Sequence, residues 1–353
     1  MTDDPDHRGP VMFLVLLAIT ALIVVAWGVE HPGVVARSAA PVGGPATVEQ
    51  GGAPALEPSP SVVEQGGAPA PSVVETPAPT QGADHPDPER SPAPLPDGGT
   101  RVFGGGHVLV AYYGTAQTAA MGVLGESDPA TMDARLRRAA RPFGGPDRPV
   151  RHVYELIVTI ADGSPGPDGD YSHDVPRAEV ERYVAAAHRH HALLVLDLQP
   201  GRSGFLDVAR RWAWALRDPW VGLALDPEWR MAPHQVPART IGQVSAREVN
   251  RTSAWLAALT RRERLPQKLF VLHQFRVDMV EHVEDVVRRP GLAMVQHVDG
   301  FGTRQQKRAT YHAVARPRTF TMGFKLFYDE DVDRMGGPAV RALRPPVRFV
   351  SFQ

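Results

Sequence analysis

The chain has 353 residues, with 38 Lys and Arg against 39 Asp and Glu, and it contains no cysteine. A formal net charge of −1 at pH 7 argues against a nucleic-acid-binding protein, which would carry a basic stripe or patch. The lack of cysteine excludes disulfides, thiolate metal sites, a cysteine nucleophile and a lipidated N-terminal cysteine, although it does not exclude an oxidising compartment.

A candidate membrane segment lies within residues 1–30. Residues 11–29 (VMFLVLLAITALIVVAWGV) are uncharged and almost wholly apolar, which matches the ~20 residues needed to cross a bilayer core. The run exceeds the ~7–15-residue apolar core of a cleaved signal peptide. We therefore predict a retained transmembrane anchor. Cleavage near Ala36 is the alternative, and it would give a secreted protein.

Residues 31–100 read as a linker. They are rich in Pro, Gly, Ala, Ser and Val, and the sequence VEQGGAPA occurs at 48–55 and again at 63–70. Such a composition cannot bury enough apolar area to offset its chain entropy, so we predict a disordered Pro/Gly/Ala-rich spacer. A spacer after a single-pass anchor favours a domain held outside the cytoplasm at the cell membrane; a cytoplasmic tether is the alternative.

Residues 101–353 are predicted to form the folded domain, because they hold nearly all of the aromatic residues. Apolar runs typical of strands alternate there with amphipathic helical patterns. The predicted strands are 107–113, 154–160, 192–198, 220–226, 268–274, 292–297, 322–328 and 347–352. The predicted helices are 129–140, 177–190, 204–217, 245–262, 277–288, 304–314 and 331–343.

The alternation of strands and helices predicts an α/β fold built from βαβ units around a parallel sheet. Eight strands in ~250 residues favour a closed (β/α)8 TIM barrel over an open doubly wound sheet. A dinucleotide-binding fold is not indicated, because the Gly-rich stretch FGGG at 103–106 precedes the first strand instead of following it.

Polar and aromatic residues cluster where these strands end. In a barrel, functional residues collect at the C-terminal ends of the strands, and residues i and i+2 of a strand face the same way. Three strands end in such polar pairs, so we predict a ring of side chains around one concave site. The candidates are Tyr112, Tyr113, Asp162, Asp197, Gln199, Asp226, Glu228, Trp229, His273, Gln274, His297, Asp299, Lys325, Tyr328 and Asp329.

A structural explanation also exists for the acids among them. An Asp after a strand often caps the next helix, or pairs with a nearby arginine such as Arg202 or Arg230. Caps do not require paired polar residues on three strands, which favours the functional interpretation.

Paired carboxylates beside aromatic residues point to glycoside hydrolysis, which needs a protonated acid and a second group at an oxocarbenium-like centre. Asp226 and Glu228 face the same way, so ionising both is disfavoured and one pKa should rise. We predict Glu228 as the general acid and Asp226 as the group that tunes it or orients substrate. In a two-carboxylate mechanism, Asp299 or Asp329 would be the nucleophile or base. The other candidates would bind substrate.

The sequence Asp226-Pro227-Glu228 at the end of the fourth strand resembles the Asp-x-Glu motif of barrel glycosidases such as the family 18 chitinases and family 25 lysozymes. The resemblance implies that Glu228 is the acid and that Asp226 positions the substrate. Residues 326–329 (LFYD) are similar to the chitinase Met-x-Tyr-Asp motif, one strand late. The further acids of the chitinase signature are replaced by Val221 and Ala224 here, so the resemblance covers the architecture and a few residues.

We therefore expect a membrane-anchored, extracytoplasmic glycoside hydrolase that acts on a cell-envelope polysaccharide, without cofactor, metal or nucleic acid. One alternative is a metal-dependent hydrolase on the same barrel, with ligands drawn from Asp162, Asp197, Asp226, His273, His297 and Asp299. That alternative lacks support from a His-x-His or His-Glu-x-x-His motif. The other alternative is a barrel that binds glycans without turning them over.

Overall fold

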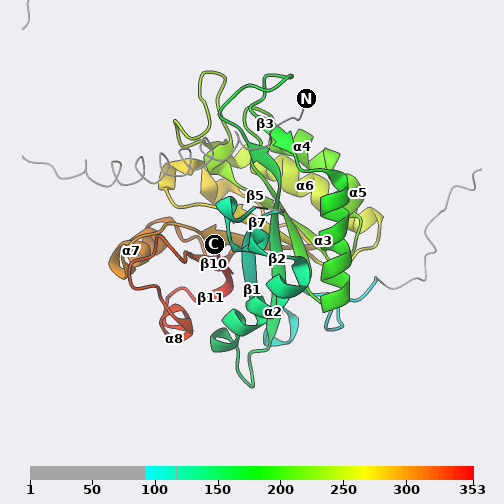
Figure 1. Cartoon of the computed structure of the whole chain (residues 1–353), viewed down its shortest axis with the longest axis vertical. Helices are drawn as coiled ribbons and strands as arrows, with labels where there is room; N and C mark the ends of the chain where they lie inside the picture. Colours follow the sequence, from blue (N-terminus) through cyan, green and yellow to red (C-terminus); the bar gives the residue numbers. More distant parts are fainter. Residues whose placement is uncertain (1–91, 117) are drawn as a thin grey trace, which may run out of the picture. The chain divides into compact units, whose positions relative to one another are not determined.

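A closed parallel barrel forms the centre of the computed structural model, which describes residues 92–116 and 118–353 (Figure 1). Its strands follow chain order around the ring, and β1 pairs with both β2 and β11, which closes it. The eight-stranded parallel barrel predicted from the sequence is thus confirmed. The strands are β1 (Val108–Thr115), β2 (Val150–Ala161), β4 (Leu193–Leu198), β5 (Val221–Leu225), β7 (Lys268–His273), β9 (Leu292–Val298), β10 (Thr321–Leu326) and β11 (Val347–Phe352).

Three short strands lie outside the ring. β3 (Ser172–Asp174) pairs antiparallel with the end of β2, and β6 (Val244–Ser245) pairs parallel with β8 (Val280–Glu281). The loop that joins β2 to β3 therefore starts at the C-terminal end of the barrel.

Helices surround the barrel on the outside (Figure 1). They are α2 (Pro129–Ala140), α3 (Arg177–His190), α4 (Phe205–Arg211), α5 (Ala213–Leu216), α6 (Ala246–Arg262), α7 (Arg304–Val314) and α8 (Gly337–Arg341). Local sequence sets several helix starts. The Asp128 side chain accepts from the amides of Ala130 and Thr131 at the start of α2, and Thr303 forms a capping box with Gln306 at the start of α7.

The helix predicted at 277–288 is wrong. This segment forms two 3₁₀ turns, η6 (Val277–Met279) and η7 (Val283–Asp285), on either side of β8. Val280 and Glu281 pair with β6 as a strand, and His282 adopts a left-handed φ of 53° that interrupts a helix.

The helix predicted at 331–343 is shorter than expected. Only α8 is helical there, because Asp333 has a φ of 56° and Pro338 lies in the first turn of the helix, a position that favours a helix start.

The interior of the barrel changes from apolar to polar along the strands. The lower layer includes Val153, Val195, Ala224, Val271 and Val295, all of them buried in one apolar cluster. Two residues further along each strand, the same inward face carries a polar group. These groups are Glu155, Asp197, Asp226, His273 and His297. The apolar layer therefore forms the floor of a polar layer at the C-terminal end of the barrel.

The predicted membrane segment at 11–29 lies outside the described residues, as does the predicted linker up to residue 91. Within the described part of the chain, no helix is both long enough and apolar enough to cross a bilayer. Leu95, which falls in the predicted linker range, is 2% exposed and packs in the apolar cluster of the barrel interior. Ordered structure therefore reaches back into that range.

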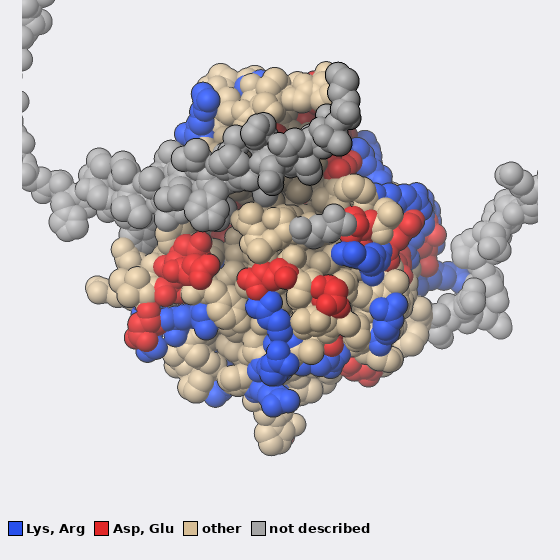
Figure 2. Space-filling model, in the orientation of Figure 1, with Lys and Arg blue, Asp and Glu red and all other residues tan. Residues whose placement is uncertain are grey.

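Acidic and basic side chains lie next to one another on the face shown in Figure 2, in keeping with the nearly balanced composition of the chain.

Candidate active site

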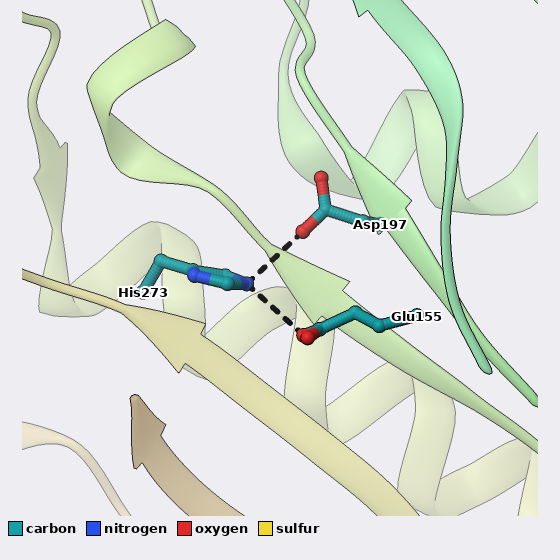
Figure 3. A group of neighbouring side chains, drawn as sticks. All are labelled: Glu155, Asp197 and His273. Carbon is teal, nitrogen blue, oxygen red and sulfur yellow. Dashed lines mark ion pairs between the residues drawn. The ribbon is translucent and has the colours of Figure 1, made fainter. Parts of the chain in front are cut away.

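The imidazole of His273 occupies the centre of the polar layer. Its Nε2 lies 3.2 Å from Glu155 Oε1 and 3.1 Å from Asp197 Oδ2, while its Nδ1 lies 2.9 Å from Asp299 Oδ2. Figure 3 shows Nε2 directed between the carboxylates of Glu155 and Asp197, which come from β2 and β4. His273 therefore contacts three carboxylates, which lie on or directly after three other strands of the ring.

These contacts determine the charge of His273, whose side chain is fully buried. Burial by itself lowers the pKa of a histidine, because it disfavours the charged ring. The contacts with Asp197, Asp299 and Glu155 outweigh that effect and raise the pKa of His273 well above its ordinary value. The ring is therefore an imidazolium, although the charge of the nearby Lys325 opposes the shift.

Lys325 on β10 is a second buried cation in this layer. Its Nζ lies 3.7 Å from Asp299 Oδ2, 3.1 Å from Gln353 Oε1 and 3.6 Å from the ring centre of Tyr113. Burial raises the pKa of Asp299, but the hydrogen bond from His273 and the charges of His273 and Lys325 lower it below its usual value. Asp299 is therefore ionised, and its Oδ1 is buried without a hydrogen bond to the described residues.

Asp226 and Glu228 flank the start of a 3₁₀ turn, η5 (Pro227–Trp229), that directly follows β5. The Asp226 side chain makes no capping bond, and both of its oxygens are buried without a hydrogen-bond partner among the described residues. The amide of Gly242 donates to the Glu228 carbonyl at 2.7 Å. A Cβ on Gly242 would come within 2.5 Å of the Arg230 carbonyl, so only glycine allows this close support of the turn.

The nearby arginines have other partners. Arg230 pairs with Glu248 at 3.0 Å, and Arg202 donates to the carbonyl of Gln235. The Asp226 side chain therefore neither caps a helix nor pairs with one of these arginines, which contradicts the structural explanation for this acid.

The two carboxyls of the η5 turn both have raised pKa values. Burial, followed by the charge of Glu228, raises the pKa of Asp226 well above its usual value. Burial, followed by the charge of Asp299, raises the pKa of Glu228 to about 7, although Lys325 and His273 oppose the shift. Glu228 is therefore protonated up to near-neutral pH, while Asp299 is ionised.

His297 supports the layer from β9 as a neutral ring. Burial and the charge of His273 lower its pKa well below the usual value, and its Nε2 lies 2.7 Å from Ser351 Oγ. Gly323 on β10 makes room for this ring, because a Cβ there would lie 2.4 Å from His297 Nδ1.

The structure brings most of the predicted site residues together. Besides the residues above, Gln199 approaches the Tyr113 hydroxyl at 3.4 Å, and Trp229 is partly buried on η5. Five predicted residues lie elsewhere, and the strand pleat or the loop explains each of them. These are Tyr112, Asp162, Gln274, Tyr328 and Asp329.

Tyr112 and Gln274 point outward because they alternate with the inward residues Tyr113 and His273. Tyr112 packs in the outer apolar cluster and meets the Tyr328 hydroxyl at 3.2 Å, and Gln274 accepts from Gln296 at 2.7 Å. Asp162 lies past the end of β2 and pairs with His173 at 2.6 Å. Asp329 is exposed on the loop after β10.

Sequence reasoning missed Glu155, Ser351 and Gln353. Glu155 is fully buried in the middle of β2. The signal was present, because an acid in the middle of an apolar strand is rare unless it is paired. Glu155 lies well before the end of β2, so the pattern of polar residues at strand ends does not include it.

No protein-family model matches the chain, and a search of curated proteins finds no match. The fold and the site by themselves define a TIM-barrel-like protein, and its buried cluster of acids and histidine is compatible with an enzyme.

Proposed function

We propose that this protein is a glycoside hydrolase in which Glu228 is the general acid and Asp299 is the second catalytic carboxylate. One observation carries the proposal. Two electrostatically coupled carboxyls at the C-terminal end of a parallel barrel have pKa values shifted in opposite directions. A protonated acid beside an ionised carboxylate is the pair that glycoside hydrolysis requires.

The contacts of each carboxyl support these roles. Glu228 lies on a turn held by Gly242, and it keeps its proton near pH 7 for donation to the leaving oxygen. Asp299 is fixed through Oδ2 by His273, which leaves Oδ1 free to act on the sugar or on a water. Asp226, held protonated by burial, would donate a hydrogen bond to the substrate.

The substrate class follows from the predicted organisation of the chain. An anchor at 11–29 and a Pro/Gly/Ala-rich linker would hold the barrel at the outer side of the cell membrane, which supports a cell-envelope polysaccharide as substrate. Trp229, which is partly buried on η5, would offer an aromatic face to a sugar ring.

The test uses the full chain, purified in detergent and assayed on a panel of envelope polysaccharides. Glu228→Gln should lower kcat by roughly 10²- to 10⁴-fold, because it removes the proton donor. Glu281→Gln, at an exposed carboxylate on β8, should retain wild-type activity. Activity should fall as the pH rises through about 7, where Glu228 loses its proton.

Two results would contradict the proposal. Wild-type hydrolysis that Glu228→Gln leaves intact would remove the assigned acid. Glycan binding without hydrolysis of any polysaccharide would favour a binding barrel.

A further inference from the structure

We propose that Glu155, Asp197 and His273 bind one divalent transition-metal cation inside the barrel. One ligand atom from each residue lies within 4.8 Å of the others, and Nε2 of His273 is 3.2 and 3.1 Å from the two carboxylates. Donor atoms with these separations can all contact a cation at coordination distances of about 2.0–2.4 Å. The site does not depend on the glycosidase assignment.

The first argument comes from hydrogen bonding. Oε2 of Glu155 and Oδ1 of Asp197 are buried and have no hydrogen-bond partner among the described residues, whereas Oε1 of Glu155 and Oδ2 of Asp197 contact Nε2 of His273 at 3.2 and 3.1 Å. Buried polar atoms are normally satisfied, and each unsatisfied one is costly. Here the three side chains converge from three strands on a common point, where a cation would satisfy one donor atom on each residue (Figure 3).

The second argument is the orientation of the imidazole. Nδ1 of His273 is hydrogen-bonded to Asp299 Oδ2 at 2.9 Å, and Lys325 in turn approaches the same oxygen. A carboxylate on the far nitrogen is the usual support of a metal-bound histidine, because it fixes the ring and directs the other nitrogen to the ion.

The ligand set indicates the kind of ion. Imidazole nitrogen suits Zn²⁺ and related transition ions, and carboxylate oxygen suits Mn²⁺ as well, whereas Ca²⁺ and Mg²⁺ prefer oxygen alone. Three protein ligands also leave coordination positions open, as in catalytic rather than structural metal sites.

The experiment measures metal binding to the full chain after chelator treatment, with Zn²⁺ or Mn²⁺ added in equilibrium dialysis. We expect one ion per chain with a Kd at or below the micromolar range, and binding of Mg²⁺ and Ca²⁺ at least tenfold weaker. Glu155→Gln and Asp197→Asn should each weaken binding by at least 100-fold. Glu228→Gln, a matched change in the same layer, should bind within threefold of wild type.

A spectroscopic measurement on the wild type covers the case that a variant does not fold. The Mn²⁺ complex should show magnetic coupling to one imidazole nitrogen. Absence of one-to-one binding, absence of nitrogen coupling, or wild-type affinity in folded Glu155→Gln and Asp197→Asn would each overturn the metal site. Because Glu228→Gln separates hydrolysis from metal binding, the proposed function and the metal site can fail independently.

Discussion

Single residues determine the charge state of the polar layer. Glu228 and Asp299 are both carboxyls in the same layer, yet their surroundings differ. Asp299 receives a hydrogen bond from His273, whereas the negative charge of Asp299 is the largest charge that raises the pKa of Glu228. The chemistry therefore depends on which side chain touches which, more than on the number of acids.

The packing of His297 depends on the absence of a side chain at Gly323. In Gly323→Ala, the new Cβ would lie 2.4 Å from His297 Nδ1, so the ring must move and its contact with Ser351 weakens. We expect a loss of about 1–3 kcal/mol in the free energy of unfolding, measured in urea. Gly163→Ala meets nothing within 4 Å and should change stability far less. Equal stabilities for the two variants would show that His297 adjusts freely.

At the scale of elements, the end of β10 is held by α7. Lys307 on α7 is 1% exposed, donates to the carbonyls of Gly300 and Lys325, and pairs with Asp331 at 2.8 Å. Asp331 also accepts from the amide of Phe327 at 3.0 Å. This buried pair therefore fixes the strand end that presents Lys325 to the polar layer.

Removing one charge of this pair should destabilise the fold. Asp331→Asn leaves the Lys307 ammonium buried without its counter-charge, so we expect a loss of about 3–5 kcal/mol in thermal or urea unfolding. The control is Asp333→Asn in the same loop, where Asp333 pairs with Arg304 on the surface and its side chain is 75% exposed. That variant should lose much less stability, because solvent screens exposed pairs. Similar losses in both variants would contradict a special role for the buried pair.

At the scale of the whole molecule, ring closure is what assembles the site. Glu155 is distant in sequence from Asp299, yet both contact His273 because parallel strands end on the same side of the barrel. Closure also gives each barrel strand two hydrogen-bonded neighbours.

Closure predicts a pattern of amide exchange with deuterium. The eight barrel strands should exchange slowest, because opening any of them breaks two strand pairings. The loop at 162–171 and the two-residue pair of β6 and β8 should exchange much faster. Mass spectrometry of peptic fragments would resolve these segments. If β1 or β11 exchanged as fast as that loop, the ring would be open at their pairing.

Much of the fold could be predicted from the sequence, because it depends on local patterns. Buried strands read as apolar runs, and amphipathic patterns place the helices α2, α3 and α7. The segment at 277–288 could not be distinguished in this way, since its valine spacing fits a helix, whereas β8 pairs with the distant β6 and His282 has a left-handed φ.

The candidate site also depends partly on local sequence patterns and partly on the tertiary structure. The sequence by itself determined that polar residues follow the apolar strand cores, and the pleat then placed Asp197, Asp299 and His273 inward. Only the tertiary structure decided that Glu155 joins them, that Asp329 does not, and that Glu228 and Asp299 carry opposite pKa shifts. The physical reason is range: strand pairing and side-chain alternation are local, whereas burial and charge coupling depend on atoms that the closed ring brings together.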